Sequence, residues 1–140
     1  MTALSKGVRG ADTPVDLRLD LERDPQAPSL ARAAVAGFCE RGELDSEQAS
    51  TLALLVSELV SNAVMHSLAP PASGILLCVC RLDDGGVRVE VIDRGSGFTA
   101  IPRDPGRSNG GYGLFLVDRQ ASRWGVDRVG GTRVWFELAP

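Results

Sequence analysis

Residues 57–66, SELVSNAVMH, place three polar side chains four positions apart within an otherwise apolar stretch. At about 100° per residue, Glu58, Asn62 and His66 would lie along one ridge of a helix spanning residues 46–66. The apolar stripe beside this ridge consists of Leu52, Leu55, Leu59 and Ala63. The ridge is either a solvated helix edge or one wall of a metal-assisted site. In such a site, the Asn62 oxygen would suit Mg²⁺ and Glu58 could act as a general base.

Length and composition indicate one globular domain at residues 14–140, after a flexible lead-in at 1–13. No apolar run approaches the roughly 20 residues of a membrane span, and the first residues lack the apolar segment of a signal peptide. We therefore expect a cytoplasmic protein. The net charge of −3 argues against direct nucleic-acid binding. The three cysteines have no metal-like spacing and are expected to be buried and reduced.

Hydrophobic periodicity and turn residues predict the order of the elements. We expect strands at 15–21, 75–82, 87–92, 124–129 and 132–138, and helices at 29–41, 46–66 and about 113–122. Asp45 or Ser46 can cap the second helix, and Gly42 can end the first. Hairpin-paired strands with separate helices favour an α/β (α+β) two-layer sandwich. Its sheet would be mixed and mostly antiparallel, with the helices on one face.

A glycine-rich turn follows the strand that ends in VIDRGSGF, residues 91–98. Gly95 and Gly97 allow a sharp turn and leave room for a flat ligand to approach the backbone. Asp93 at the strand end can accept hydrogen bonds from an exocyclic amine such as that of adenine. The segment is equally compatible with an ordinary strand-exit turn.

A second glycine-rich turn, NGGYGLFLV at residues 109–117, leads directly into a predicted helix. Exposed N–H groups at a helix N-terminus bind phosphate oxygens, and the helix dipole assists them. Gly110, Gly111 and Gly113 match neither a dinucleotide fingerprint nor a P-loop. Taken alone, the segment could also be a flexible linker followed by a helix start.

In this order and spacing, the three segments resemble the N, G1 and G2 boxes of the GHKL (Bergerat-fold) ATPase superfamily. The resemblance covers about Val15 to Leu138 and is closest to single-domain anti-sigma-factor serine kinases of the actinobacterial type. It implies that Asn62 coordinates the Mg²⁺ ion that bridges the ATP phosphates, and that Glu58 acts as the base. Asp93 would read the adenine amino group.

The resemblance also implies a set of further nucleotide contacts. These are His66, Gly95, Gly97, Arg107, Gly111, Tyr112, Gly113, Leu114 and Thr132. Gly111 and Gly113 would meet the phosphates, and residues 98–110 would form an ATP lid. Arg103 and Arg107 in that lid could neutralise phosphate charge.

The sequence departs from the family pattern at two positions. Tyr112 stands where many relatives carry an arginine between the two glycines. Near the C-terminus, the slot in which relatives often carry a threonine is occupied by Arg133, and the threonine is Thr132. Because a one-residue offset in a strand turns a side chain to the opposite face, Thr132 is a weaker candidate for an adenine-side contact than a threonine at position 133 would be.

The function implied by the resemblance is that of a Mg²⁺- and ATP-dependent serine/threonine protein kinase. Such a protein binds a sigma factor to block transcription, phosphorylates a small anti-anti-sigma antagonist, and forms a homodimer. The alternative is a non-catalytic or ATP-gated module that acts by binding its partner.

Two further readings are excluded by the residues themselves. The string GRSNG at 106–110 resembles a hydrolase nucleophile elbow, but a proline-rich segment precedes it in place of the required strand. A sensor histidine kinase needs a phosphorylated histidine on a separate hairpin. The only histidine here is His66, which lies in the predicted nucleotide-site helix.

Overall fold

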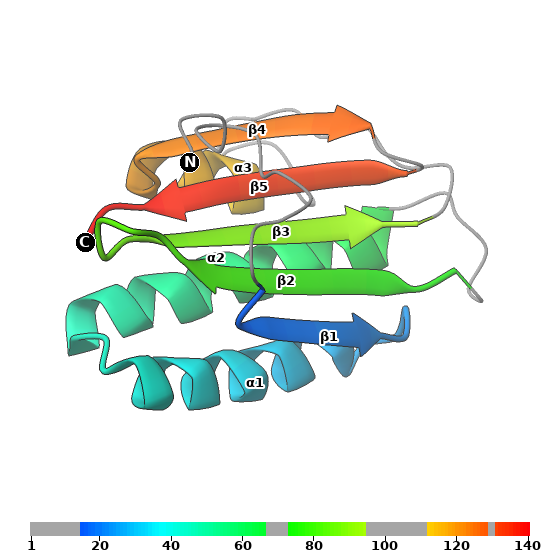
Figure 1. The fold of residues 1–140 in the computed structure, drawn as a ribbon. Helices are drawn as coiled ribbons and strands as arrows, with labels where there is room; N and C mark the ends of the chain where they lie inside the picture. The colour runs from blue at the N-terminus through cyan, green and yellow to red at the C-terminus, as the bar shows by residue number, and fades with distance from the viewer. Residues whose placement is uncertain (1–14, 67–72, 95–111, 129–130) are drawn as a thin grey trace.

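The structure is a computed structural model that describes residues 15–66, 73–94, 112–128 and 131–140 (Figure 1). The side chains of His66 and Tyr112 and the burial of Gly113 also lie outside this description. The elements are β1 (Leu17–Leu21), α1 (Ala27–Gly42), α2 (Ser46–His66), β2 (Ile75–Arg81), β3 (Val87–Asp93), α3 (Tyr112–Gln120), β4 (Arg123–Arg128) and β5 (Thr132–Leu138). Every expected helix and strand is therefore present.

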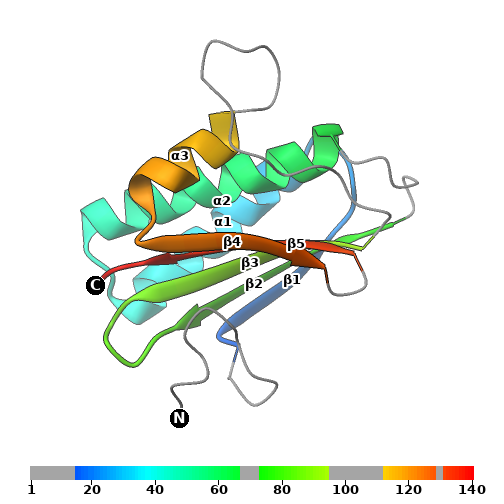
Figure 2. The same ribbon diagram turned by 90° about the horizontal axis from the view of Figure 1, so that it is seen from above.

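The strands form one five-stranded sheet in the order β1-β2-β3-β5-β4. The three helices cover one face of it, as the view along the sheet shows (Figure 2). The predicted two-layer α/β fold is confirmed. The pairings between neighbouring described strands are all antiparallel, whereas the sequence predicts a mixed, mostly antiparallel sheet.

The core lies between the sheet and the helices. Alternate residues of β3, namely Val87, Val89 and Val91, are buried on the inner face. They join a cluster to which α2 contributes Leu52, Leu55, Val56, Leu59, Val60 and Ala63. The predicted apolar stripe of α2 is thus the surface that packs on the sheet. None of the described helices is long and apolar enough to cross a membrane.

The helix ends follow from local chemistry. Helix α1 begins two residues earlier than predicted, because Pro28 occupies its first turn, where the missing proline N–H costs no hydrogen bond. It ends at Gly42, and Glu43 follows in the left-handed conformation with φ of 56°. Asp45 caps α2 by accepting a 2.7 Å hydrogen bond from the Gln48 N–H.

The outer face of the sheet carries a buried group of ion pairs. Arg88, which is 1% exposed, donates to Glu90 at 3.1 Å and to Glu137 at 2.9 Å. The Arg88 guanidinium also lies 4.3 Å from the centre of the Trp135 ring. Arg133 donates to Asp127 at 2.8 Å, and this hydrogen bond is the main reason that the pKa of Arg133 is raised. The alternating pattern of β3 therefore places charges, as well as valines, in buried positions.

We expect Arg88→Ala to lower the free energy of unfolding by about 3 kcal/mol. It removes the nearest counter-charge of two buried carboxylates, which keep the longer ion pairs of Glu90 with Arg133 at 3.9 Å and of Glu137 with Arg123 at 3.8 Å. Urea denaturation measures this loss. The control is Arg94→Ala, which breaks the exposed 3.0 Å ion pair with Asp20 and should cost less than about 1 kcal/mol. Equal losses in the two variants would contradict this account of the outer face.

Candidate functional site

The last row of the sheet brings four buried residues side by side. The strand registers pair Leu21 with Ile75, Ile75 with Asp93, and Asp93 with Thr132. All four side chains are buried. Because residues directly opposite each other in an antiparallel pair share a face, the row lies on the inner face with the core valines of β3. Two of its four members are polar, at positions where the pattern of the sheet calls for apolar side chains.

Asp93 is the charged member of this row, and its exposed fraction is only 1%. The Arg23 Nη2 group donates to its Oδ1 atom at 2.6 Å. Arg23 follows β1 in the chain, and its Nη1 group donates to the Ala63 carbonyl of α2 at 2.8 Å. One guanidinium therefore links the end of β3 to α2.

Thr132 lies opposite Asp93 on the same face of the sheet. The expected turn of Thr132 to the opposite face is not observed, because the register turns Arg133 to the outer face and leaves Thr132 beside Asp93. A contact of Thr132 with adenine stays a prediction. Thr132 is 2% exposed, and its Oγ1 atom has no hydrogen-bond partner among the described residues. A buried hydroxyl without a partner is uncommon and calls for an explanation, such as a bound ligand or water.

Gly131 brings the start of β5 against the end of β3. A Cβ atom at this position would overlap the Asp93 carbonyl oxygen and crowd the Arg94 backbone. The glycine therefore allows the close backbone approach that sets Thr132 beside Asp93.

Helix α2 places the predicted ridge next to this row. Asn62 is buried, at 7% exposure, and Glu58 is half-buried one turn earlier. Asn62 is therefore more deeply buried than a residue at the edge of the apolar stripe, which is the position that the sequence predicts for it. The next residue, Ala63, is the one whose carbonyl accepts from Arg23. His66 is the last residue of the helix.

The N-terminal end of helix α3 holds the predicted phosphate-binding positions that the structure describes. Leu114 is buried in the core, so its side chain serves packing, while its backbone belongs to the first turn of the helix. Tyr112 and Gly113 form the start of α3. The remaining predicted positions lie outside the described residues: Gly95, Gly97, Arg103, Arg107 and Gly111, with the whole predicted lid.

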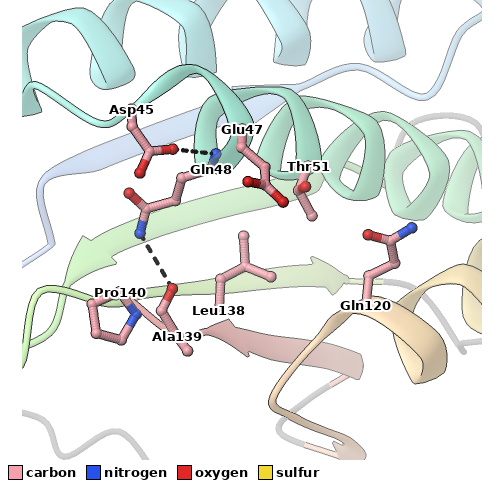
Figure 3. Close-up of a pocket in the computed structure, with 8 residues that line it drawn as sticks. All are labelled: Asp45, Glu47, Gln48, Thr51, Gln120, Leu138, Ala139 and Pro140. Atoms are coloured by element: carbon pink, nitrogen blue, oxygen red, sulfur yellow. Dashed lines mark hydrogen bonds between the residues drawn. The ribbon is translucent and has the colours of Figure 1, made fainter.

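A separate cavity of about 300 Å³ lies at the other end of the sheet (Figure 3). Its lining residues are Asp45, Glu47, Gln48, Thr51, Gln120, Leu138, Ala139 and Pro140. Leu138 pairs with Val87, at the opposite end of β3 from Asp93. None of the predicted site residues lines this cavity, so it is distinct from the site around Asp93.

Arg23 is the member of the site that the sequence analysis missed. It stands in a short acidic and proline-containing segment, LERDP at residues 21–25, where an arginine would ordinarily be solvated. Its carboxylate partner is 70 residues away in the chain. No local spacing could have signalled the contact.

Comparisons with known proteins point to one family. Residues 21–138 match the family described as histidine kinase-like ATPase domain. The anti-sigma F factor of Clostridium botulinum (strain Alaska E43 / Type E3) is 30% identical over 87 residues, which are 62% of this chain and 61% of that protein. The serine-protein kinase RsbW of Listeria monocytogenes serovar 1/2a is 27% identical over 114 residues, which are 73% of each protein. The chain thus spans about three fifths of the length of that anti-sigma F factor.

Solved structures agree with the sequence matches. The RsbU and RsbW domains of Rv1364c from Mycobacterium tuberculosis share the fold with a TM-score of 0.72 and 26% identity, over 91% of this chain and 32% of that one. The SiaB–SiaC complex from Pseudomonas aeruginosa gives a TM-score of 0.63 at 12% identity, which shows the fold alone. The predicted resemblance to GHKL proteins of the anti-sigma-factor kinase type is confirmed.

We expect Thr132→Val to leave the free energy of unfolding unchanged or to raise it by up to about 1 kcal/mol, because it removes a buried hydroxyl that lacks a partner. If that hydroxyl serves a nucleotide, the same variant should bind ATP roughly 5- to 10-fold more weakly. Calorimetry and urea denaturation measure the two effects.

Thr132→Ser keeps the hydroxyl and is the matched control, so it should bind ATP nearly as well as the wild type. Undiminished ATP affinity in Thr132→Val would remove Thr132 from the site.

Proposed function

Because the chain belongs to the histidine kinase-like ATPase domain family, we propose that it binds Mg²⁺-ATP around Asp93 and acts as an anti-sigma-factor serine/threonine kinase. The observation that carries this proposal is the buried pair of Asp93 and Thr132, with a Thr132 hydroxyl that has no partner among the described residues. Purely structural burial would favour apolar side chains in both positions.

The acceptor and hydroxyl groups of this row suit an adenine base. The exocyclic amine of adenine is a donor, and the Asp93 carboxylate can accept its hydrogen bond. The Thr132 hydroxyl can both donate and accept, so it can serve a ring nitrogen or a water beside the base. Gly131 keeps β5 close enough for both groups to act on one flat ligand.

The phosphate end of the nucleotide would lie between α2 and the start of α3. Asn62 offers a neutral oxygen of the kind that Mg²⁺ accepts, and Mg²⁺ takes its remaining ligands from phosphates and water. The described residues contain no group of three or more His, Cys, Asp or Glu side chains that could hold a metal ion without the nucleotide. Because Asn62 is the one protein ligand in the proposal and Mg²⁺ takes oxygens from phosphates, metal binding should depend on ATP.

Phosphoryl transfer needs mainly positioning and charge neutralisation. Bound Mg²⁺ would supply charge neutralisation at the phosphates, and N–H groups of the first turn of α3 would bind phosphate oxygens. Glu58 is half-buried one helical turn before Asn62, so it can accept the proton of an incoming serine or threonine hydroxyl.

The partners follow from the relatives and are part of the proposal. The protein would bind a sigma factor in the cytoplasm and phosphorylate a small anti-anti-sigma protein, in a partner-switching system. A homodimer is a further prediction of the resemblance, and light scattering on the purified protein tests it. The alternative is that the domain regulates by partner binding alone, without phosphoryl transfer.

We expect Glu58→Gln to lower phosphoryl transfer from γ-labelled ATP to the antagonist by at least about 100-fold, because general-base catalysis contributes on that scale. ATP binding should change less than about 2-fold, because the amide has the same shape. The substrate in this assay is a purified small antagonist protein. The control is the same antagonist with its candidate serine replaced by alanine.

Asn62→Ala gives the matching test at the metal. It should lose Mg²⁺-dependent ATP binding together with transfer, whereas Glu58→Gln loses transfer alone. Equal transfer by wild type and Glu58→Gln would remove Glu58 as the general base. Sigma-factor binding without any transfer by the wild type would favour the non-catalytic alternative.

A further inference from the structure

Arg23 makes two hydrogen bonds that join separate parts of the site. Its Nη2 group donates to Asp93 Oδ1 at 2.6 Å, and its Nη1 group donates to the Ala63 carbonyl at 2.8 Å. The Arg23 side chain is 6% exposed and that of Asp93 is 2% exposed. This is a desolvated ion pair at the carboxylate assigned above to the adenine amine.

The buried pair raises the question of whether adenine displaces Arg23 or shares Asp93 with it. A charge-assisted hydrogen bond is roughly twice as strong as one between neutral groups, and the adenine amine is a neutral donor. Displacement would also leave a guanidinium buried without its counter-charge, which is strongly unfavourable. An ionised carboxylate has about four acceptor positions, so it can serve both donors at once. Sharing is therefore favoured over displacement.

We propose that Arg23 is a positioning residue for base recognition. Its guanidinium donates to Asp93 and to the α2 backbone, and it thereby fixes the orientation of the carboxylate that accepts the hydrogen bond from the adenine amine. It also ties this carboxylate to Ala63, the residue after the proposed metal ligand Asn62. The proposal rests on the proposed nucleotide site and assigns to Arg23 a role in that site's affinity for adenine.

The role requires an arginine and not only a positive charge. The guanidinium is a rigid planar fork that can donate to two acceptors in fixed directions, whereas a lysine ammonium is a point charge on a flexible stem. The two acceptors here belong to different elements, β3 and α2, so the fork sets the distance between them. Loss of Arg23 should remove the fixed donor that orients the Asp93 carboxylate and so weaken adenine binding without touching the phosphates.

The test is a double-mutant cycle on ATP affinity, measured by calorimetry with Mg²⁺ for wild type, Arg23→Met, Asp93→Asn and the double variant. We expect Arg23→Met to bind both ATP and ADP roughly 10-fold more weakly, by the same factor, since both ligands carry the same base. The double variant should bind within about 3-fold of Asp93→Asn, because Arg23 acts through Asp93.

A general loss of structure would give additive losses of affinity for the two single variants. Thermal denaturation checks that each variant is folded, and Arg23→Gln, which also lacks the charge, takes the place of Arg23→Met if the latter does not fold. The matched control is Arg81→Met. Arg81 donates to the Gly42 carbonyl at 2.7 Å at the other end of the sheet, so its loss should leave ATP affinity within about 2-fold.

The outcomes separate the role of Arg23 from the existence of the nucleotide site. Wild-type or tighter ATP binding by Arg23→Met or Arg23→Gln would overturn the proposal, as would additive losses in the cycle. In either case the nucleotide site itself would stand, because the wild type binds. Absence of ATP binding by the folded wild type would overturn the proposed function, and the role of Arg23 with it.

Discussion

A carboxylate buried at the end of the central strand is the constraint on which this part of the molecule depends. Asp93 is 1% exposed, and an ionised group without a partner would be very costly at such a position. The fold meets this cost by bringing Arg23 from the connection after β1 to the end of β3, where it also binds the α2 backbone. Three elements that are distant in sequence are thereby fixed at one point, which is the point where the proposed base-binding row lies.

The two faces of the sheet bury polar groups in different ways. On the outer face, Arg88 lies between Glu90 and Glu137, and Arg133 and Arg123 add longer ion pairs to the two glutamates, so opposite charges are balanced within the sheet itself. On the inner face, Thr132 is equally buried, yet its hydroxyl has no partner among the described residues. The first arrangement stabilises a fold, and the second suits a ligand that brings its own donors and acceptors. The Thr132 hydroxyl lies beside the Asp93–Arg23 ion pair, and this combination favours a site on the inner face of the sheet, in agreement with the family to which the chain belongs.

Local patterns predicted most of the fold, because each element carries its own periodicity and its own end signals. Asp45 caps α2, and α1 ends at Gly42, as the sequence predicts. The sequence predicts a later start for α1, because a proline commonly separates two elements. Pro28 nevertheless fits the first turn of the helix. What the sequence could not supply was the strand register, which places Thr132 opposite Asp93 on the inner face. It also could not supply the Arg23 contact, which depends on tertiary structure alone.

The central claim is that this row of the sheet and helix α2 together form a Mg²⁺-ATP site. Calorimetric titration of the purified wild type with ATP, once with Mg²⁺ and once with a chelator, tests it most directly. The account predicts saturable binding of one ATP per chain that weakens by at least about 10-fold when Mg²⁺ is removed, since the metal would join Asn62 to the phosphates. No heat of binding in either condition, from protein shown to be folded, would contradict the claim.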